Sequence, residues 1–121
     1  MDQRKQTGQR GERLARQYLE GKGWTILAMN WRTRLGELDI VAKSPEDAHV
    51  VFVEVRTRRS KAYGTAAESV DYRKQQKLRR LGLQYAQMHG LLNHPLRFDV
   101  IAVYIPSAAE RPQVTHIVAA F

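Results

Sequence analysis

A long helical pattern interrupts the series of apolar runs in this chain, and this order restricts the sheets that it can build. Three apolar runs, at residues 24–31, 37–42 and 50–57, follow one another with short polar links, which is typical of an antiparallel meander. The next run, at residues 97–105, comes only after a helical pattern over residues 70–89. A helix between consecutive strands indicates a crossover, so the sequence predicts a mixed central sheet flanked by helices.

Two further segments complete the expected fold. A helical pattern over about residues 9–22 precedes the first strand, and a short last strand is expected at residues 114–119. There is no repeat, low-complexity tract or linker, and 121 residues are enough for one core. The sequence therefore predicts a single α/β domain over residues 1–121, in which residues 1–7 are flexible.

The charge of the chain points to a polyanionic partner. There are 20 Lys and Arg residues against 12 Asp and Glu residues, a net charge of +8, and residues 56–80 alone carry +7. Such a basic stretch favours nucleic acid over a merely basic surface, and it lacks the exposed aromatic face of a membrane-binding helix. The candidate nucleic-acid-binding residues are Arg58, Arg59, Lys61, Arg73, Lys77, Arg79 and Arg80.

Several classes of protein are excluded by composition. The chain has no cysteine, which excludes disulfide scaffolds, thiolate zinc sites and a cysteine nucleophile. No apolar run is long enough to span a bilayer, and no apolar stretch follows the basic N-terminus as it would in a secretory signal. We therefore expect a cytoplasmic protein without a membrane partner.

Two acidic residues interrupt apolar strands in this basic chain. Asp39 lies in the strand at residues 37–42 and Glu54 in the strand at residues 50–57. Side chains alternate along a strand, so Glu54 and Arg56 share a face, about 6.6–7 Å apart. If the two strands pair, Asp39 and Glu54 lie side by side and repel each other unless a cation separates them. A Mg²⁺ or Mn²⁺ ion would satisfy this arrangement.

Structural salt bridges are the alternative explanation for these acids. Arg32, Arg34 or Arg56 could neutralise each carboxylate, and spacing alone does not decide between a metal site and ion pairs. We expect Asp99 and His116, which lie on the last two strands, to have structural roles.

Alternation also assigns the neighbours of Asp39. It places Glu37 on the face of Asp39, and Leu38 on the face of Ile40. Glu37 lies near the start of its strand, so we expect its side chain to be exposed to solvent.

Four segments together resemble a known family. They are GQRGERLARQYL at residues 8–19, GELDIVA at 36–42, FVEVRTR at 52–58 and RFDVIAV at 97–103. This combination is similar to the bacterial YraN-like family, which in turn resembles the restriction-endonuclease-like superfamily and especially the archaeal Holliday junction resolvases. The resemblance implies an αβββαβ core, a metal-dependent endonuclease that acts on DNA, and a homodimer.

The resemblance also implies roles for individual residues. Asp39 matches the acid of the second strand, Glu54 the acid of the third strand, and Glu12 the glutamate of the first helix. Asp39 and Glu54 would then bind Mg²⁺ or Mn²⁺.

The chain departs from the superfamily signature at one position. Arg56 stands where the signature has a lysine, and an arginine cannot act as a general base, although it can hold a phosphate. Lys74 is a candidate replacement because it lies four residues before Leu78 and seven before Leu81, within the apolar stripe of the long helix. Alternatively, its amine extends into solvent.

Two functions follow from these expectations. The first is a metal-dependent endonuclease in which Asp39, Glu54, Arg56, Lys74 and Glu12 form the catalytic site. The second is a non-catalytic nucleic-acid-binding protein that retains the nuclease fold, which the change of lysine to Arg56 favours modestly.

Overall fold

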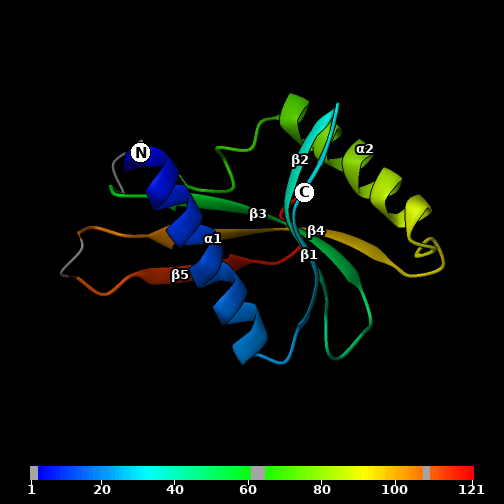
Figure 1. The fold of residues 1–121 in the computed structure, drawn as a ribbon, viewed down its shortest axis with the longest axis horizontal. Helices are drawn as coiled ribbons and strands as arrows, with labels where there is room; N and C mark the ends of the chain where they lie inside the picture. Colours follow the sequence, from blue (N-terminus) through cyan, green and yellow to red (C-terminus); the bar gives the residue numbers. More distant parts are fainter. Residues whose placement is uncertain (1–2, 61–64, 108–109) are drawn as a thin grey trace.

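The computed structural model describes residues 3–60, 65–107 and 110–121. Its five strands form one mixed sheet in the order β1-β2-β3-β4-β5, in which β3 and β4 run parallel and the other neighbours are antiparallel (Figure 1). The predicted mixed sheet and the αβββαβ order are therefore confirmed. The elements are α1 (Gln3–Gly21), β1 (Thr25–Thr33), β2 (Gly36–Lys43), β3 (Val50–Arg58), α2 (Tyr72–Met88), β4 (Leu96–Tyr104) and β5 (Gln113–Ile117).

The first helix begins earlier than the apolar pattern predicts. Of residues 1–7, which we expected to be flexible, residues 3–7 belong to α1, and residues 1–2 lie outside the described residues. Residues 3–7 carry no apolar stripe, but Gln, Lys and Arg have favourable helix propensities and extend the helix beyond its packed part. No helix among the described residues is long and apolar enough to cross a membrane.

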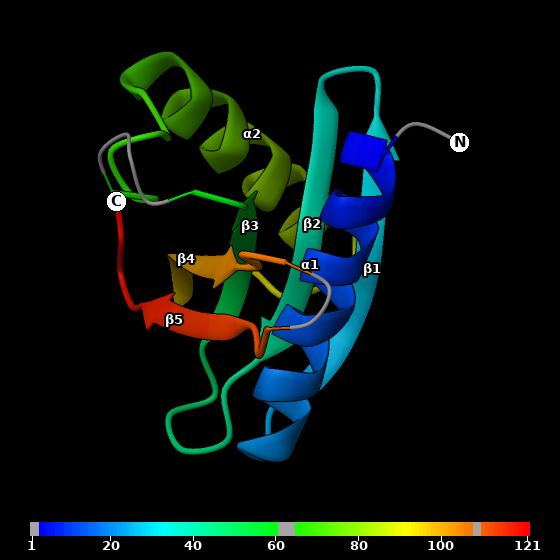
Figure 2. The same ribbon diagram turned by 90° about the vertical axis from the view of Figure 1, so that its left-hand side faces the viewer.

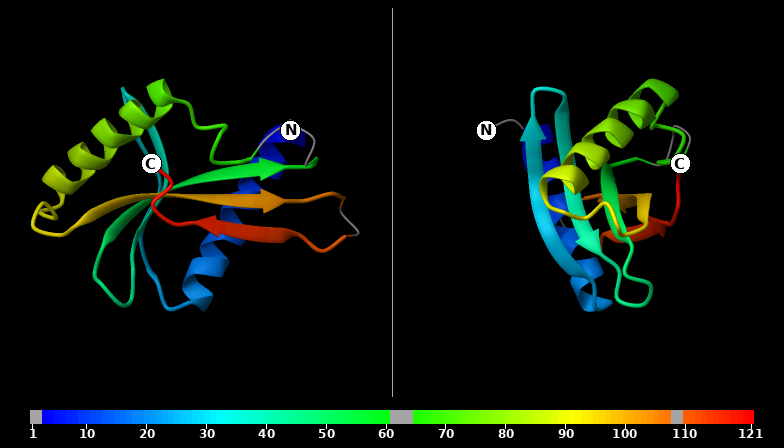
Figure 3. Two further views of the ribbon diagram at one scale, coloured as in Figure 1. Left: turned by 180° about the vertical axis from the view of Figure 1, so that it is seen from behind. Right: turned by 90° about the vertical axis from the view of Figure 1, so that its right-hand side faces the viewer.

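The two helices cover opposite faces of the sheet. Figure 2 shows α1 in front of the sheet and α2 behind it, and the right-hand view of Figure 3 shows the reverse. Ala15 and Leu19 of α1 are buried in one apolar cluster with Ile40 and Val53. The second cluster lies on the other face and contains Leu78, Leu81 and Tyr85 of α2 with Val41, Phe52, Phe98 and Val100 of the sheet.

Two glycines allow the helices to lie directly on the sheet. A Cβ atom built on Gly11 would lie 1.8 Å from Oγ1 of Thr57, so α1 contacts β3 with no room for a side chain. A Cβ atom on Gly82 would lie 2.9–3.0 Å from the rings of Phe98 and Phe52. These contacts fix the distance of each helix from the sheet and thereby place Glu12 of α1 and Lys74 of α2.

The second strand leaves the third at Asp39. The pairing of β2 with β3 runs from Lys43 to Ile40, whereas the pairing with β1 continues to Gly36. The β1–β2 hairpin accordingly rises away from β3 in Figure 1. Leu38 lies in the cluster beneath α2 and Ile40 in the cluster beneath α1. The predicted alternation, which placed both on one face, is therefore wrong at this point of divergence.

Candidate functional site

Asp39 and Glu54 lie next to each other where the two strands separate. The Oδ2 atom of Asp39 accepts a hydrogen bond of 2.9 Å from the backbone N–H of Val55. Burial and the neighbouring Glu54 raise the pKa of Asp39 to about 8, because two adjacent carboxylates cannot both ionise cheaply in a partly buried site. The side-by-side arrangement expected from the sequence is thus present.

Asp39 has no cationic partner among the described residues. Arg32 pairs with Glu37, at 2.8 Å between Nη2 and Oε2, and the guanidinium of Arg56 donates to the carbonyl of Ser69 at 3.4 Å. Arg34 makes no ion pair with either acid among the described residues, so none of the three arginines considered from the sequence neutralises Asp39. A proton on Asp39 would relieve the repulsion between the two carboxyl groups, in keeping with the raised pKa of Asp39.

Glu54 has a cationic neighbour from the second helix. Its side chain is only 8% exposed, and its Oε2 atom lies 3.7 Å from Nζ of Lys74. Lys74 thus points toward the sheet rather than only into solvent, which was one of the two alternatives at this position. Asp71 caps α2 by accepting from the backbone N–H of Lys74 at 2.9 Å, which fixes the first turn of the helix.

A second group of acids lies beside Asp39. Carboxylate oxygens of Glu12, Glu37 and Asp39 lie within 4.8 Å of one another. Asn30 links two of these residues, because its Nδ2 donates to both oxygens of Glu12 at 2.9 Å and to Oε1 of Glu37 at 2.8 Å. The first helix, the first strand and the second strand therefore each bring a polar side chain to the same place.

The acids of this group differ in their protonation. Burial, together with the charges of Glu37 and Glu54, raises the pKa of Glu12 although Asn30 opposes the shift. Burial acts in the same sense on Glu37, but hydrogen bonds from Arg32 and Asn30 outweigh it and lower the pKa of that carboxyl group. Glu37 therefore retains its negative charge more readily than its two neighbours.

Glu37 and Asn30 were not among the site residues predicted from the sequence. Glu37 was expected to be solvent-exposed, but its side chain is 28% exposed and held by Arg32 and Asn30. One signal was available, because pairing the first two strands through a short turn sets Asn30 opposite Asp39. The pairs Met29–Ile40 and Trp31–Leu38 flank this position.

The donor set suits a hard divalent cation. The candidate ligand atoms of Asp39, Glu12 and Glu37 are all carboxylate oxygens. Mg²⁺ and Mn²⁺ prefer such oxygen ligands. Glu54 lies beside this group, and its charge raises the pKa of Asp39. The residues present are thus compatible with the metal that the resemblance implies.

Arg56 lies farther along the same strand, beside a surface pocket. This pocket has a volume of about 260 Å³ and is lined by Arg56, Arg58 and Thr115 among others. Nε of Arg56 is buried and makes no hydrogen bond to the described residues, while Arg58 donates to the carbonyl of Thr65 at 3.0 Å. Arg56 can bind an anion only through the part of its guanidinium that borders this pocket.

The candidate nucleic-acid-binding residues occupy two regions. Arg73, Lys77 and Arg80 are exposed on α2, whereas Arg59, beyond the end of β3, donates to Oγ1 of Thr7 at 3.4 Å. Arg79 packs over the rings of Phe98 and Phe121, at 5.4 and 5.6 Å from their centroids. Lys61 lies outside the described residues.

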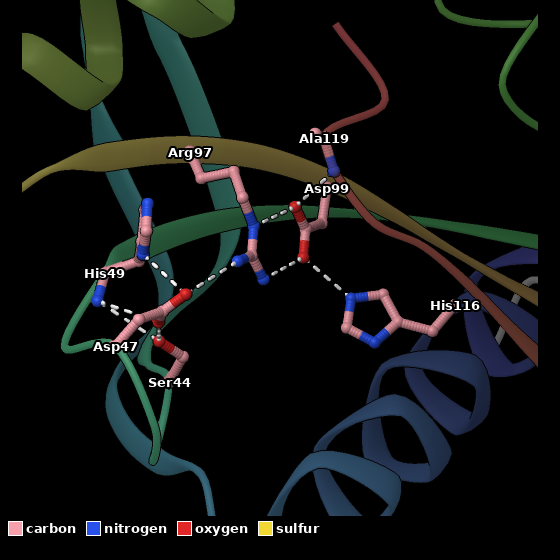
Figure 4. Close-up of polar contacts among 7 residues, drawn as sticks. All are labelled: Ser44, Asp47, His49, Arg97, Asp99, His116 and Ala119. Atoms are coloured by element: carbon pink, nitrogen blue, oxygen red, sulfur yellow. Dashed lines mark hydrogen bonds and ion pairs between the residues drawn. The ribbon is translucent and has the colours of Figure 1, made fainter.

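A separate polar network surrounds Asp99 (Figure 4). This fully buried carboxylate accepts from Nε and Nη2 of Arg97 at 2.9 and 3.0 Å. It also accepts from Nε2 of His116 at 2.7 Å and from the backbone N–H of Ala119 at 2.9 Å. These hydrogen bonds lower the pKa of Asp99 despite its burial. They join β4, β5 and the C-terminal residues, as a structural role requires.

Sequence comparison extends the resemblance across the site. The model of "Uncharacterised protein family UPF0102" matches residues 11–103, which include Glu12, Asp39, Glu54 and Lys74. A UPF0102 protein of Moorella thermoacetica is 48% identical over 102 residues, covering 84% of this chain and 83% of the relative. One from Stutzerimonas stutzeri is 46% identical over 111 residues, covering 91% of each chain. The expected membership is therefore confirmed, and the chain belongs to the YraN-like UPF0102 family.

Proposed function

We propose that this protein is a metal-dependent endonuclease that acts on DNA and is related to the Holliday junction resolvases. The observation that carries the proposal is the placement of Asp39 beside Glu54 where β2 leaves β3. Glu12 of the first helix adds a third carboxylate beside Asp39. The superfamily signature has acids at these same three places.

Asp39 and Glu54 would hold the metal, with Glu12 close by. A bound Mg²⁺ or Mn²⁺ polarises a phosphate and lowers the pKa of a bound water, which is the chemistry of phosphodiester hydrolysis. Asp39 must give up its proton before it can ligate. The protein contributes the shared position of the carboxylates and the burial that keeps water away from Glu54.

Lys74 and Arg56 would together replace the lysine that the superfamily signature has at position 56. Lys74 brings an amine to 3.7 Å from Glu54, where it can hold or donate a proton beside the carboxylates. Arg56 lies on the strand face of Glu54 and lines the pocket beside β3, where its guanidinium can orient a phosphate. Arg58, Arg73, Lys77 and Arg80 would contact the flanking phosphates.

One observation favours the second candidate, a non-catalytic nucleic-acid-binding protein. The guanidinium of Arg56 already donates to the carbonyl of Ser69, which anchors the segment before α2. An arginine used in this way need not take part in cleavage. In that case the basic residues bind DNA and the acidic residues take no part in catalysis.

A cleavage assay separates the two candidates. The chain is incubated with Mn²⁺ and with duplex, branched and single-stranded DNA, beside Asp39→Asn and the matched acid-removal control Glu46→Gln. Glu46 is an exposed acid in the turn after β2. We expect cleavage by the wild-type chain and by Glu46→Gln, and none by Asp39→Asn. DNA binding without cleavage by any of the three would support the non-catalytic protein.

The oligomeric state is part of the same proposal. Enzymes that cut two symmetric strands of a junction work as pairs of identical subunits. We therefore expect a homodimer in sedimentation experiments with branched DNA. A single copy on each junction would contradict this part of the proposal.

A further inference from the structure

Asn30 has an unusual backbone for a residue inside a strand. Its φ angle is +50°, in the left-handed region, which asparagine tolerates better than most residues with a side chain. It lies between Met29 and Trp31, which pair with Ile40 and Leu38 of β2. With this backbone conformation the Asn30 side chain reaches Glu12 of α1, 18 positions earlier in the chain.

The side chain of Asn30 binds two acids from different elements. Its Nδ2 lies 2.9 Å from each oxygen of Glu12 and 2.8 Å from Oε1 of Glu37. Ionised carboxylates only accept hydrogen bonds, so the amide must present its NH₂ group to both of them. Asn30 therefore connects α1 to β2 through a neutral donor.

Without such a donor, the acids would separate. Oxygens of Glu12, Glu37 and Asp39 gather within 4.8 Å, and like charges at this separation repel. Arg32 offsets part of the charge of Glu37, but Glu12 has no cation beside it among the described residues. The hydrogen bonds that Asn30 donates to both acids hold Glu12 and Glu37 together when no ion is bound.

We propose that Asn30 is a positioning residue of the metal centre, which holds Glu12 and Glu37 beside Asp39 so that Glu37 serves as an additional carboxylate for the cation. This inference rests on the proposed function. A carboxylate oxygen has two lone-pair sites, so it can accept from Asn30 and face an ion at the same time. Partners that hydrogen-bond to metal ligands typically contribute a factor of about 10–100 to metal affinity.

The alternative is that Asn30 is present only because its backbone needs a residue that tolerates a positive φ. Asn30→Gly separates the two roles, since glycine keeps this backbone conformation and removes the amide. Ala48→Gly is the matched control, because Ala48 has a φ of +55° and is exposed in the turn between β2 and β3.

The test measures Mn²⁺ binding to the metal-free full chain by isothermal titration calorimetry. We expect Asn30→Gly to weaken the affinity about 10- to 100-fold and Ala48→Gly to leave it unchanged. Unchanged affinity in Asn30→Gly, with a wild-type chain that binds Mn²⁺, would overturn the inference and leave the proposed function standing. A wild-type chain that neither binds Mn²⁺ nor cleaves DNA would overturn the proposed function, and the inference with it.

A second pair of variants decides the matter if Asn30→Gly does not fold. Glu37→Gln removes the proposed ligand charge, and Arg32→Gln breaks the same ion pair from its other side. We expect Glu37→Gln to weaken Mn²⁺ binding about tenfold or more, and Arg32→Gln to bind at least as tightly as the wild type. Equal weakening in both variants would show that the ion pair matters, and not the carboxylate, and would overturn the inference.

Discussion

Burial and the neighbouring Glu54 raise the pKa of Asp39 to about 8, whereas an aspartate in an unfolded chain titrates near 4. Between these two values the folded chain holds a proton that the unfolded chain has lost. Because the native state binds more protons, the free energy of unfolding falls as the pH rises through this window. Asp39 therefore destabilises the metal-free protein at neutral pH, as expected of a group selected for ligation rather than for stability.

Asp39→Asn tests directly how much Asp39 lowers the free energy of unfolding. The amide keeps the shape of the acid and carries no charge, so we expect the metal-free variant to gain up to about 5 kcal/mol at pH 8 and only about 1–2 kcal/mol at pH 5. Urea denaturation at the two pH values gives the comparison, with Glu46→Gln as the exposed control. A variant that is less stable than the wild type at pH 8 would show that Asp39 is paired with a cation after all.

The residues of the site were predictable to different degrees. Asp39 and Glu54 stand out as acids in apolar strands, and the short link between their strands predicts that they meet. Asn30 and Glu37 are polar residues near the ends of their expected strands, so neither interrupts an apolar run, and only the pairing of the first two strands, which sets Asn30 opposite Asp39, indicated where Asn30 lies. Their roles depend on the left-handed backbone at Asn30 and on the divergence of β2 from β3.

At the scale of single elements, the contact between α1 and β3 decides where Glu12 lies. The helix approaches so closely that a Cβ atom at Gly11 would fall 1.8 Å from Oγ1 of Thr57. Glu12 follows Gly11 directly, so any outward shift of the helix moves its carboxylate away from Asp39. The glycine is therefore needed for the site as well as for packing.

Gly11→Ala should push α1 away from β3. We expect a loss of about 1–3 kcal/mol in the free energy of unfolding, as in other overpacked contacts, together with weaker Mn²⁺ binding. Gly8→Ala is the matched control in the same helix, because a Cβ atom there has nothing within 4 Å, and alanine should stabilise the helix slightly. Chemical denaturation of both variants checks this, and equal stability of the two would contradict the close contact.

The elements were easier to predict than their ends. The periodic pattern located both helices and all five strands. In the sequence the apolar stripe of the long helix, at Leu78, Leu81 and Tyr85, continues to Met88 with the same spacing, which predicts that Met88 is buried. Met88 is the last residue of α2 and is 66% exposed, since the stripe is buried only where the helix lies over the sheet. Periodicity shows which face a residue occupies and not where the partner surface stops.

At the scale of the whole molecule, the crossover through α2 explains why the charged surface lies beside the acids. The parallel pairing of β3 with β4 requires a connection that crosses one face of the sheet. That connection is the basic segment, and it brings Lys74 to Glu54. The order of strands and helices predicted this mixed topology, whereas the departure of β2 from β3 depends on twist and packing that no local pattern records.

The basic residues of α2 should give DNA binding a strong dependence on salt. If about six phosphates are contacted, the logarithm of the binding constant falls against the logarithm of salt concentration with a slope of about −4 to −5. Arg73 and Arg80 are exposed and available, so Arg73→Gln and Arg80→Gln should each reduce this slope by about one, for all sequences alike.

Arg79 and Arg16 provide the contrast for this last prediction. Arg79 packs over Phe98 and Phe121, so its removal should lower the melting temperature as well as weaken binding.

Arg16 is exposed on α1, on the opposite face of the sheet, and pairs only with Glu20 among the described residues. We expect Arg16→Gln to change neither the melting temperature nor the salt slope, as judged by fluorescence anisotropy across a range of salt concentrations. If Arg16→Gln lowered the slope as much as Arg80→Gln, DNA would contact both faces and α2 would not be the binding surface. A slope near zero for the wild-type chain would remove nucleic acid as its partner, because the basic segment cannot bind phosphates without releasing counterions.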